Sequence, residues 1–351
     1  NGEKSAIVKS YMAHHLGMSM LALDNFLNKN IMQERFHSNP MIRSAELLLQ
    51  ERIPDKALIT KKFKEKLVPV RKTVHEEKEV IRRFGIPEGE IPEMHVMSNG
   101  EYSVMLTDGG SGYSKLKDTA VSRWQGYTRG RAQGTFIFVQ NINSNTAWSA
   151  TYEPFNAEPE EYSVTFYPDK AVFKRKDGNI ETRTEVMVST EENAEIRRVT
   201  LTNHSQHDRT LEVTSYLELV LAPMDADIAH PAFSNLFVTT EFMNENNCLL
   251  ASRRPRSARQ KTIWAMHSIT FEGDEPGNLQ YETDRSKFIG RNRDLSNPVA
   301  MEADHPLSDT AGSVLDPVMS LRKRVTVHPG QSVKISYITA IGDKRIQMLE
   351  I

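Results

Sequence analysis

Residues 209–221 read RTLEVTSYLELVL, and apolar and polar side chains alternate along most of this stretch. In an extended chain, the apolar face would carry Leu211, Val213, Leu217, Leu219 and Leu221. The polar face would carry Thr210, Glu212, Thr214 and Glu218. Because successive side chains of a strand point to opposite sides, this pattern predicts a β-strand that packs one face on a core.

The same period of two recurs in residues 162–166, 180–188 and 332–339. Turn-forming pairs separate such runs, among them Asp177-Gly178 and Pro329-Gly330. Short alternating runs joined by such turns are typical of antiparallel sheet.

We count about a dozen candidate strands and no convincing helix between residues 95 and 345. Strands this numerous, without crossover helices, predict a mainly β fold of two stacked antiparallel sheets. The alternation slips at Arg197-Arg198, where we expect a β-bulge.

A helical period marks the N-terminal part instead. Apolar side chains recur at this spacing in residues 4–27, which predicts a buried amphipathic helix. A second helix is expected from Asn39 or Pro40 to Gln50, with Pro54 after it. Two helices cannot close a core, so we expect them to pack on the rest of this chain or on a helical domain outside it.

The charge balance excludes one class of partner. The 351 residues include 44 Lys+Arg and 46 Asp+Glu, for a formal net charge of −2. A nucleic acid would select a strongly basic surface, so no nucleic-acid partner is expected. No apolar run approaches the roughly 18–20 residues that span a bilayer, which predicts a soluble segment. The single cysteine, Cys248, excludes an internal disulfide.

Both ends of the chain suggest that it is part of something longer. It opens on Asn1-Gly2-Glu3 and stops at Ile351, inside a segment that begins at residue 344 and that we expect to continue. We therefore expect a piece of a larger polypeptide, whose chemistry can lie outside these residues.

His14 and His15 are the first candidate site. Adjacent helical residues point about 100° apart, so the two imidazoles would not easily share a metal ion, and we expect no metal site. A histidine on an apolar helix face is most often a hydrogen-bonded core residue. The alternative is contact with a sugar hydroxyl at the edge of a helical barrel.

A glycine-rich stretch is the second candidate. Residues 107–113 read TDGGSGY, and glycine allows close approach of the backbone. The stretch lacks the Gly-Lys-Ser/Thr ending of a phosphate-binding loop. It predicts either a tight connection between strands or a loop that reaches into a carbohydrate site.

Aromatic side chains beside polar ones are the third candidate. Sugar rings have apolar C–H faces and hydroxyl edges, so their sites pair aromatic platforms with donors such as arginine. Together with the two histidines, the carbohydrate-binding candidates are Tyr113, Arg123, Trp124 and Trp148. Aromatic residues equally suit a sandwich core, which is the more natural interpretation of Trp148.

Glycoside hydrolysis needs two carboxyl groups about 5–10 Å apart, a distance that sequence does not supply. The acidic candidates, all most simply solvated loop residues, are Glu158, Glu160, Glu161, Asp225 and Asp227. His204 and His207 would suit a mutarotase-like acid only if a glutamate faced them. We predict no catalytic residue and no self-contained active site.

Several strings of residues, taken in order, resemble one family. They are SYMAHH (10–15), ELLLQERIP (46–54), TDGGSGYS (107–114), LTNH (201–204), LEVTSY (211–216), HPAFS (230–234), RRPR (253–256) and GSVLDP (312–317). The series resembles the cyclic β-1,2-glucan synthases, which are very large membrane-bound bacterial proteins. It departs from the family pattern at residues 115–117 and 130–133.

The resemblance implies three parts. Residues 1–60 would be the helical tail of a glucoamylase-like (α/α)6 domain, and residues 61–94 a linker. Residues 95–345 would form a β-supersandwich of galactose-mutarotase-like topology. In the resemblance, this sandwich precedes the catalytic barrel of glycoside phosphorylases of family 94, formerly glycosyltransferase family 36. No catalytic motif of the family falls on this chain, and no cofactor is implied for it.

The resemblance also implies a function for the parent protein, a glycosyltransferase or glycoside phosphorylase at the bacterial inner membrane. This segment would lie on the cytoplasmic side, support an adjacent catalytic (α/α)6 domain and border the path of a β-linked glucan, most simply a β-1,2-glucan. Dimer contacts through the sandwich are implied as well. The alternatives are a free-standing carbohydrate-binding sandwich and a mutarotase-like epimerase.

Overall fold

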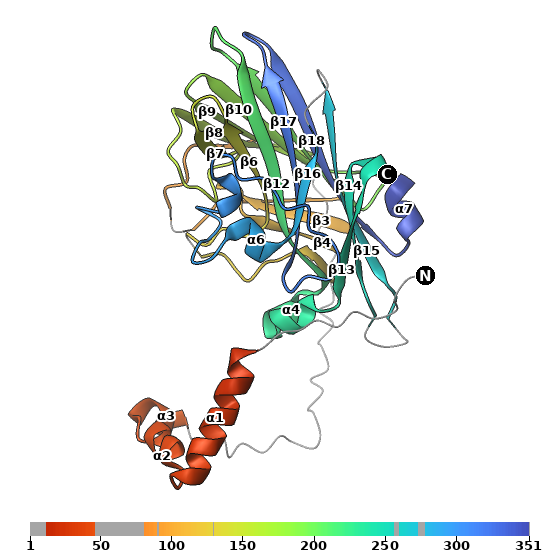
Figure 1. Cartoon of the computed structure of the whole chain (residues 1–351). Coiled ribbons are helices and arrows are strands. Elements are labelled where there is room, and N and C mark those ends of the chain that lie inside the picture. The colour runs from red at the N-terminus through yellow and green to blue at the C-terminus, as the bar shows by residue number, and fades with distance from the viewer. Residues whose placement is uncertain are drawn as a thin grey trace, which may run out of the picture. The chain divides into compact units, whose positions relative to one another are not determined.

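The computed structural model describes residues 12–45, 81–89, 91–128, 130–255, 260–272 and 278–350. The chain divides into two units, Asn1–Glu76 and Glu77–Ile351. The first is helical where it is described, and the second consists mainly of strands (Figure 1). Among the described residues, no helical segment combines the length and hydropathy that crossing a bilayer requires.

Three helices make up the described part of the first unit: α1 (Ala13–Leu27), α2 (Ile31–His37) and α3 (Pro40–Ala45). α1 and α3 confirm the helices predicted in residues 4–27 and 39–50, while residues 4–11 and 46–50 of those predictions lie outside the described residues. The expected burial of the first helix is not observed. Lys29 and Asn30 have positive φ angles of 53° and 66°, which turn the chain between α1 and α2. No residue of α1 is buried, so its apolar stripe is exposed.

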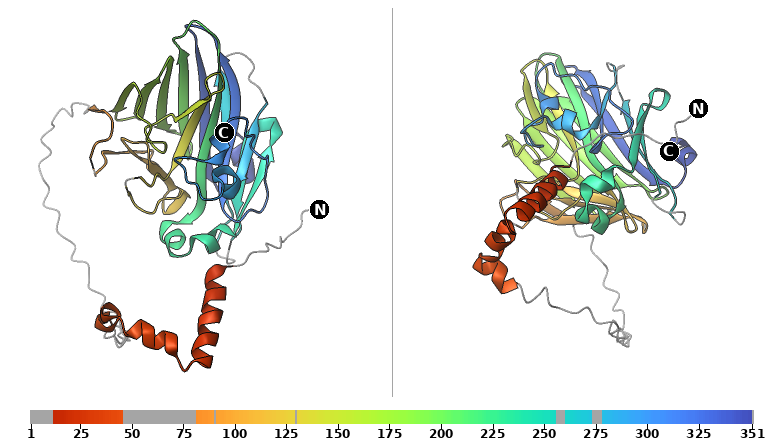
Figure 2. Two further views of the ribbon diagram at one scale, coloured as in Figure 1. Left: turned by 60° about the vertical axis from the view of Figure 1, so that its left-hand side comes forward. Right: turned by 60° about the horizontal axis from the view of Figure 1, so that its bottom comes forward.

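The second unit contains two antiparallel sheets, which confirms the predicted mainly β class (Figures 1 and 2). The strands of the first sheet are, in spatial order, β1 (Arg82–Phe84), β8 (Glu161–Phe166), β9 (Lys170–Asp177), β10 (Ile180–Val188), β11 (Ala194–Asn203), β18 (Ser332–Gly342), β15 (Ile263–Glu272), β14 (Cys248–Arg253) and β13 (Val238–Met243). Those of the second sheet are β16 (Gln280–Asp284), β17 (Pro317–Val327), β12 (Arg209–Pro223), β5 (Thr119–Ser122), β4 (Gly112–Leu116), β3 (Tyr102–Thr107) and β2 (Met94–Ser98), with β6 (Thr135–Asn141) paired to β12 and β7 (Thr146–Ser149) paired to β6.

The first sheet starts early in the chain. β1 pairs with β8, with Arg82 opposite Phe166. This strand therefore lies inside residues 61–94, the range expected to be a linker. Residues 61–80 of that range lie outside the described residues.

The long strand β12 has three partners in the second sheet. Its residues 211–217 pair with β6 on one side, and they also lie along β17 on the other. Farther along it pairs with β5, after a register shift between Leu219 and Ala222. Leu221 has a φ of +53° within this shift. Because such an irregularity bends a strand, one strand can pass from β6 to β5.

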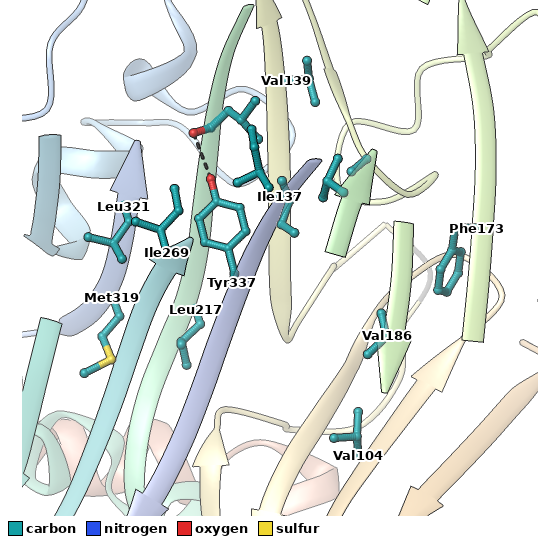
Figure 3. Packing of buried hydrophobic residues seen from close by; sticks show 14 of the residues in the cluster. Val104, Ile137, Val139, Phe173, Val186, Leu217, Ile269, Met319, Leu321 and Tyr337 are labelled. Carbon is teal, nitrogen blue, oxygen red and sulfur yellow. Dashed lines mark hydrogen bonds between the residues drawn. The ribbon is translucent and has the colours of Figure 1, made fainter. Parts of the chain in front are cut away.

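The main hydrophobic core takes side chains from both sheets (Figure 3). All five apolar members of the 209–221 pattern belong to it, which confirms the predicted core face. Tyr337 of β18 reaches across to β12, where its hydroxyl donates a hydrogen bond of 3.0 Å to the Val213 carbonyl oxygen. The core therefore contains a direct polar tie between the two sheets.

The opposite face of β12 is buried as well. Residues between β16 and β17, including Phe288 of α6 (Arg285–Ile289), join a second apolar cluster on this face. The rings of Tyr216 and Phe288 lie 4.6 Å apart between centroids. Buried Arg322 donates to Thr214 Oγ1 at 2.8 Å and lies 3.5 Å from a Glu212 oxygen. The polar side chains of β12 therefore meet protein partners.

The prediction of no helix between residues 95 and 345 is wrong. α4 (Met224–Ala229), α5 (Pro231–Asn235) and α6 all lie in this range, and α7 (Arg345–Glu350) begins at its end. Each of these helices has five or six residues. Helices so short do not complete two turns, so they leave no amphipathic period in the sequence.

The predicted bulge at Arg197-Arg198 is also wrong. β11 pairs with β10 and with β18 without a register shift. Arg197 takes an inward position because its Nη1 donates to the Thr135 carbonyl oxygen at 2.7 Å and its Nη2 to Glu195 at 3.1 Å. The polar residue that interrupts the apolar pattern is therefore an inward-facing arginine, paired with Glu195 in a regular strand.

Candidate functional site

Arg123 stands at the centre of a partly buried network of charged side chains. It follows β5 directly, and its Nε and Nη2 donate to the two oxygens of Asp227 at 3.0 and 3.2 Å. Its Nη1 donates to Glu218 at 3.1 Å and to Asp316 at 3.3 Å. Its Nη2 also donates to Asn235 Oδ1 at 2.8 Å. The guanidinium thus connects β12, α4, α5 and the residue before β17.

Glu218 lies between two arginines in this network. Its Oε1 accepts from Arg285 Nε and from the Tyr216 hydroxyl, each at 2.8 Å, and its Oε2 accepts from Arg123. Burial works to raise the pKa of Glu218, but attraction to Arg285 and Arg123 outweighs it and holds the pKa below its ordinary value. The carboxylate is therefore ionised at neutral pH.

The neighbouring Asp316 responds in the opposite direction. Burial raises its pKa, and attraction to Arg123 and Arg285 offsets this only in part. Its Oδ1 accepts from Arg123 and also from Asn235 Nδ2 at 2.8 Å. Opposed shifts of this kind occur at catalytic sites, but structural ion-pair networks produce them too. Here both carboxyl groups accept hydrogen bonds from protein donors, so we interpret the shifts as those of a structural ion-pair network.

A cavity of about 170 Å³ lies beside the network. Arg123, Glu218 and Arg285 line it together with residues 130–133 and 294–296. Its lining includes both charged donors and charged acceptors. Such a lining suits a polyol, because sugar hydroxyls both donate and accept hydrogen bonds.

Tyr113 and Trp124, two of the predicted sugar platforms, lie against each other. Their ring centroids are 5.7 Å apart, the planes are inclined by 53°, and both side chains are half-buried. Neither ring lines the 170 Å³ cavity, although Arg123 and Gln125 on either side of Trp124 do. The structure thus brings Tyr113, Arg123 and Trp124 into one region, with the donors of Arg123 engaged by protein acceptors.

Trp148 lies elsewhere, in the main core. It is 4% exposed, and its Nε1 donates to Thr182 Oγ1 of the opposite sheet at 3.1 Å. This placement favours the core interpretation over a stacking platform.

His14 and His15 lie on α1 in the first unit. Their rings meet edge to face with centroids 4.2 Å apart, and both residues are exposed. In the described structure neither is the buried core histidine that the apolar stripe suggested.

The glycine-rich stretch is the tight turn between β3 and β4. A Cβ at Gly110 would lie 2.4 Å from Thr151 Oγ1, and a Cβ at Gly112 would lie 1.9 Å from the Met105 carbonyl oxygen. Packing against neighbouring residues therefore explains these glycines. Of the two interpretations of this stretch, the structure favours a tight connection between strands over a loop that reaches into a carbohydrate site.

Sequence reasoning missed the acidic partners of Arg123. Asp227 is only 2% exposed, so its interpretation as a solvated loop acid is wrong. The physical reason is that α4 places it against the guanidinium. Glu218 lies in the 209–221 stretch and Asp316 in the string GSVLDP, but neither was singled out as a partner of Arg123. They contact Arg123 across 95 and 193 residues of sequence. No local signal reports contacts at such separations. Glu158, Glu160, Glu161 and Asp225 are exposed, as expected.

One of the two histidines considered for a mutarotase-like site does face a glutamate, but at the protein surface. His204 Nε2 lies 3.1 Å from Glu181 Oε2, and the two side chains are 47% and 40% exposed. His207 is exposed too. An exposed pair lacks the enclosed, water-excluding site that acid–base chemistry on a sugar requires.

The chain matches the family described as "Glycosyl hydrolase 94, supersandwich domain" over residues 77–351. It is 38% identical over 344 residues to cyclic β-(1,2)-glucan synthase NdvB of Rhizobium meliloti, covering 98% of this chain and 12% of that protein. It is 23% identical over 279 residues to N,N'-diacetylchitobiose phosphorylase of Vibrio proteolyticus, covering 75% of this chain and 32% of that one. A solved galactose mutarotase related enzyme of Lactobacillus acidophilus is similar with a TM-score of 0.39 and 11% identity, covering 71% of this chain and 97% of that one.

Proposed function

The chain belongs to the glycosyl hydrolase 94 supersandwich family, and on this basis we propose that it is the sandwich module of a β-1,2-glucan-processing enzyme. The observation that carries the proposal is the 38% identity to the cyclic β-(1,2)-glucan synthase over 98% of the chain. The family match begins at residue 77, whereas this identity extends over the N-terminal helices as well. The chain spans 12% of that relative, so the activity of the whole enzyme is part of the proposal.

We propose that the module itself is not catalytic. Glycoside chemistry needs one carboxyl group that donates a proton and a second that acts as base or nucleophile. Glu218, the carboxylate that lines the cavity beside Arg123, is held ionised by Arg285 and Arg123 and has no proton to donate. Asp294, on the other side, accepts hydrogen bonds from Ser296 through its Oδ1. The lining therefore supports binding better than catalysis.

Residues 1–60 would end an (α/α)6 domain, residues 61–94 would link it to the sandwich, and the sandwich would support the catalytic barrel of the parent protein. Exposed apolar side chains on α1, such as Met18, Met20 and Phe26, support a helical neighbour for this segment. Following the family resemblance, the parent would form dimers and lie at the bacterial inner membrane, with this segment on the cytoplasmic side.

The glucan would pass Tyr113 and Trp124 and reach the polar cavity beside them. Residues 130–133, where the sequence departs from the family pattern, line this cavity. Arg131 among them is exposed and donates to Gln125 Oε1 at 2.9 Å. We propose that this loop gives the module its own set of contacts with the glucan.

Calorimetric titration of the purified chain with a linear β-1,2-glucan tests the binding part of the proposal. We expect Trp124→Ala to weaken binding by about tenfold, since losing an aromatic contact costs about 1.4 kcal/mol. Trp264→Ala is the matched control, because this tryptophan is also half-buried but lies on β15 of the other sheet. Equal heats for the wild type and Trp124→Ala would remove Trp124 from the glucan path.

Turnover by the isolated chain tests the non-catalytic part. With a β-1,2-glucan and inorganic phosphate, we expect no release of glucose 1-phosphate. With free glucose, we expect no acceleration of anomer interconversion in a polarimeter. Catalysis of either reaction at an enzyme's rate would overturn the proposal.

A further inference from the structure

A second and larger cavity, of about 470 Å³, lies at the other end of β6. β6 begins at Thr135, next to the loop of the first cavity, and ends at Asn141, which lines the second. The β6–β7 hairpin contributes one side of the lining, and the turn between β9 and β10 contributes another. Both sheets of the sandwich therefore build this cavity, and it is separate from the Arg123 network.

The inner part of the lining combines apolar surface with a single amide. Trp148 and Ile180 line it with buried rings and methyl groups. Asn141 is only 7% exposed, and its Oδ1 accepts from the Asn143 N–H at 3.0 Å. Its Nδ2 has no hydrogen-bond partner among the described residues. This nitrogen is not one of the buried unpaired polar atoms of the described residues, so it is open to the cavity and can donate to a ligand acceptor.

The outer part of the lining is polar, with an excess of acidic groups. Asp177 is fixed by two hydrogen bonds of 2.6 Å from Arg175, while Glu158 and Glu160 are exposed beside it. Arg209 is the one basic residue in the lining of the described cavity. The acidic excess repels anions, so a phosphorylated or uronic-acid ligand is disfavoured.

A metal ion is a poor occupant as well. In the parts of the chain that the structure covers, no group of three or more His, Cys, Asp or Glu side chains could hold one. Neutral hydroxyl and amide groups at Ser144, Thr146 and Asn179 complete the rim. Such groups, together with carboxylates, match the mixed donor and acceptor character of sugar hydroxyls.

We infer that this cavity is a binding site for a neutral saccharide, in which the Asn141 amide donates to a sugar oxygen. Its volume lies within the range of about 300–1,000 Å³ that is typical of small-molecule sites. Trp148 supplies part of the apolar wall, since its N–H is already used by Thr182. The site is independent of Tyr113 and Trp124, so it does not rest on the glucan path proposed above.

Saturation-transfer NMR and calorimetry with two neutral probes test the inference: a linear β-1,2-linked and a linear β-1,4-linked gluco-oligosaccharide. Asn141→Asp keeps the acceptor for Asn143 and replaces the amide donor by a charged carboxylate oxygen, which accepts but does not donate. Asn179→Ala changes the exposed turn, where folding is not at stake. We expect each variant to weaken binding by about tenfold, the effect of one lost hydrogen bond that leaves a partner unsatisfied. Asn246→Ala, an exposed asparagine between β13 and β14, is the control and should bind as the wild type does.

The outcomes separate this site from the proposed function. If binding of either probe depends on Asn141 and Asn179 and survives in Trp124→Ala, the inference holds. If only the β-1,4-linked probe binds in this way, the inference still holds and the proposed β-1,2 specificity fails. If the C6-oxidised, anionic form of a probe binds as tightly as the neutral form, the inference is overturned. Binding of neither probe, or binding unaffected by both variants, overturns it as well.

Discussion

Arg123 and Asp227 form a two-pronged ion pair across 104 residues of sequence, with Nε–Oδ2 and Nη2–Oδ1 distances of 3.0 and 3.2 Å. Their side chains are 10% and 3% exposed. A planar guanidinium matches a carboxylate in this geometry better than a lysine would. Because a buried charge is costly unless it is paired, the pair fixes α4 against the end of β5.

Replacing Arg123 with methionine should destabilise the fold strongly. The change leaves Asp227 buried without its partner, and removing one member of a buried pair costs about 3–5 kcal/mol. Arg131→Met, at an exposed arginine of the same cavity, should change the free energy of unfolding by less than about 0.5 kcal/mol. Urea denaturation measures both. Equal stabilities of the two variants would show that the network is not a structural anchor.

The sheet architecture could be predicted from the sequence because its cause is local. Along β12, the five alternating apolar residues all reach the main core, as the pattern indicated: Leu211, Val213, Leu217, Leu219 and Leu221. The family membership was also predictable, because it depends on ordered strings of residues such as GSVLDP, and the match over residues 77–351 confirms it.

The environment of the polar residues could not be predicted in this way. Glu212 and Glu218 alternate with the core residues of β12, and alternation alone does not say whether water or protein faces them. An apolar cluster that includes Phe288 and Leu307 packs on that side of the strand, where both carboxylates are paired with arginines. The partner of Glu218, Arg285, is 67 residues away in sequence. Only the fold brings such groups together, so the candidate site was visible in Arg123 and hidden in its acidic partners.

Two neighbouring arginines of β11 should differ sharply. Arg197 is paired with Glu195, which is fully buried, whereas Arg198 lies on the other side of the strand and is half-buried. Arg197→Met leaves the buried Glu195 carboxylate without its partner and should lower the free energy of unfolding by about 3–5 kcal/mol. Arg198→Met should lower it by less than about 1 kcal/mol. Thermal and urea unfolding of the two variants provide the comparison. A larger loss for Arg198→Met would mean that the strand is bulged after all.

Gly112→Ala should be poorly tolerated for a steric reason. The added Cβ would lie 1.9 Å from the Met105 carbonyl oxygen, which belongs to the paired strand β3 and cannot move aside as a flexible side chain would. We expect a loss at or beyond the upper end of the about 1–3 kcal/mol typical of overpacking. At Gly85 a Cβ would meet nothing within 4 Å, so Gly85→Ala serves as the control and should fold normally. Similar unfolding curves for the two alanine variants would contradict the packing of the β3–β4 turn.

His267 should make the fold sensitive to acid. It is fully buried on β15, where Nε2 lies 2.8 Å from Ser215 Oγ and Nδ1 lies 2.9 Å from Thr339 Oγ1. Burial, helped by repulsion from Arg197, lowers its pKa from 6.5 to about 3. Below pH 6.5 the unfolded chain therefore binds a proton that the folded chain does not. The stability contributed by the neutral ring is complete above pH 6.5 and is lost as the pH falls towards 3.

This loss amounts to about 1.4 kcal/mol for each pH unit below 6.5, or about 2 kcal/mol between pH 7 and pH 5. Urea denaturation at both pH values measures this loss. On acidification from pH 7 to pH 5, the free energy of unfolding of His267→Gln should fall by about 2 kcal/mol less than that of the wild type, because glutamine does not titrate. Carboxyl groups that titrate in both proteins cancel in the difference. His207→Gln, at an exposed histidine, should lose as much stability as the wild type does. If the His267→Gln and wild-type stabilities fall in parallel with pH, the buried ring is not kept neutral in the folded chain.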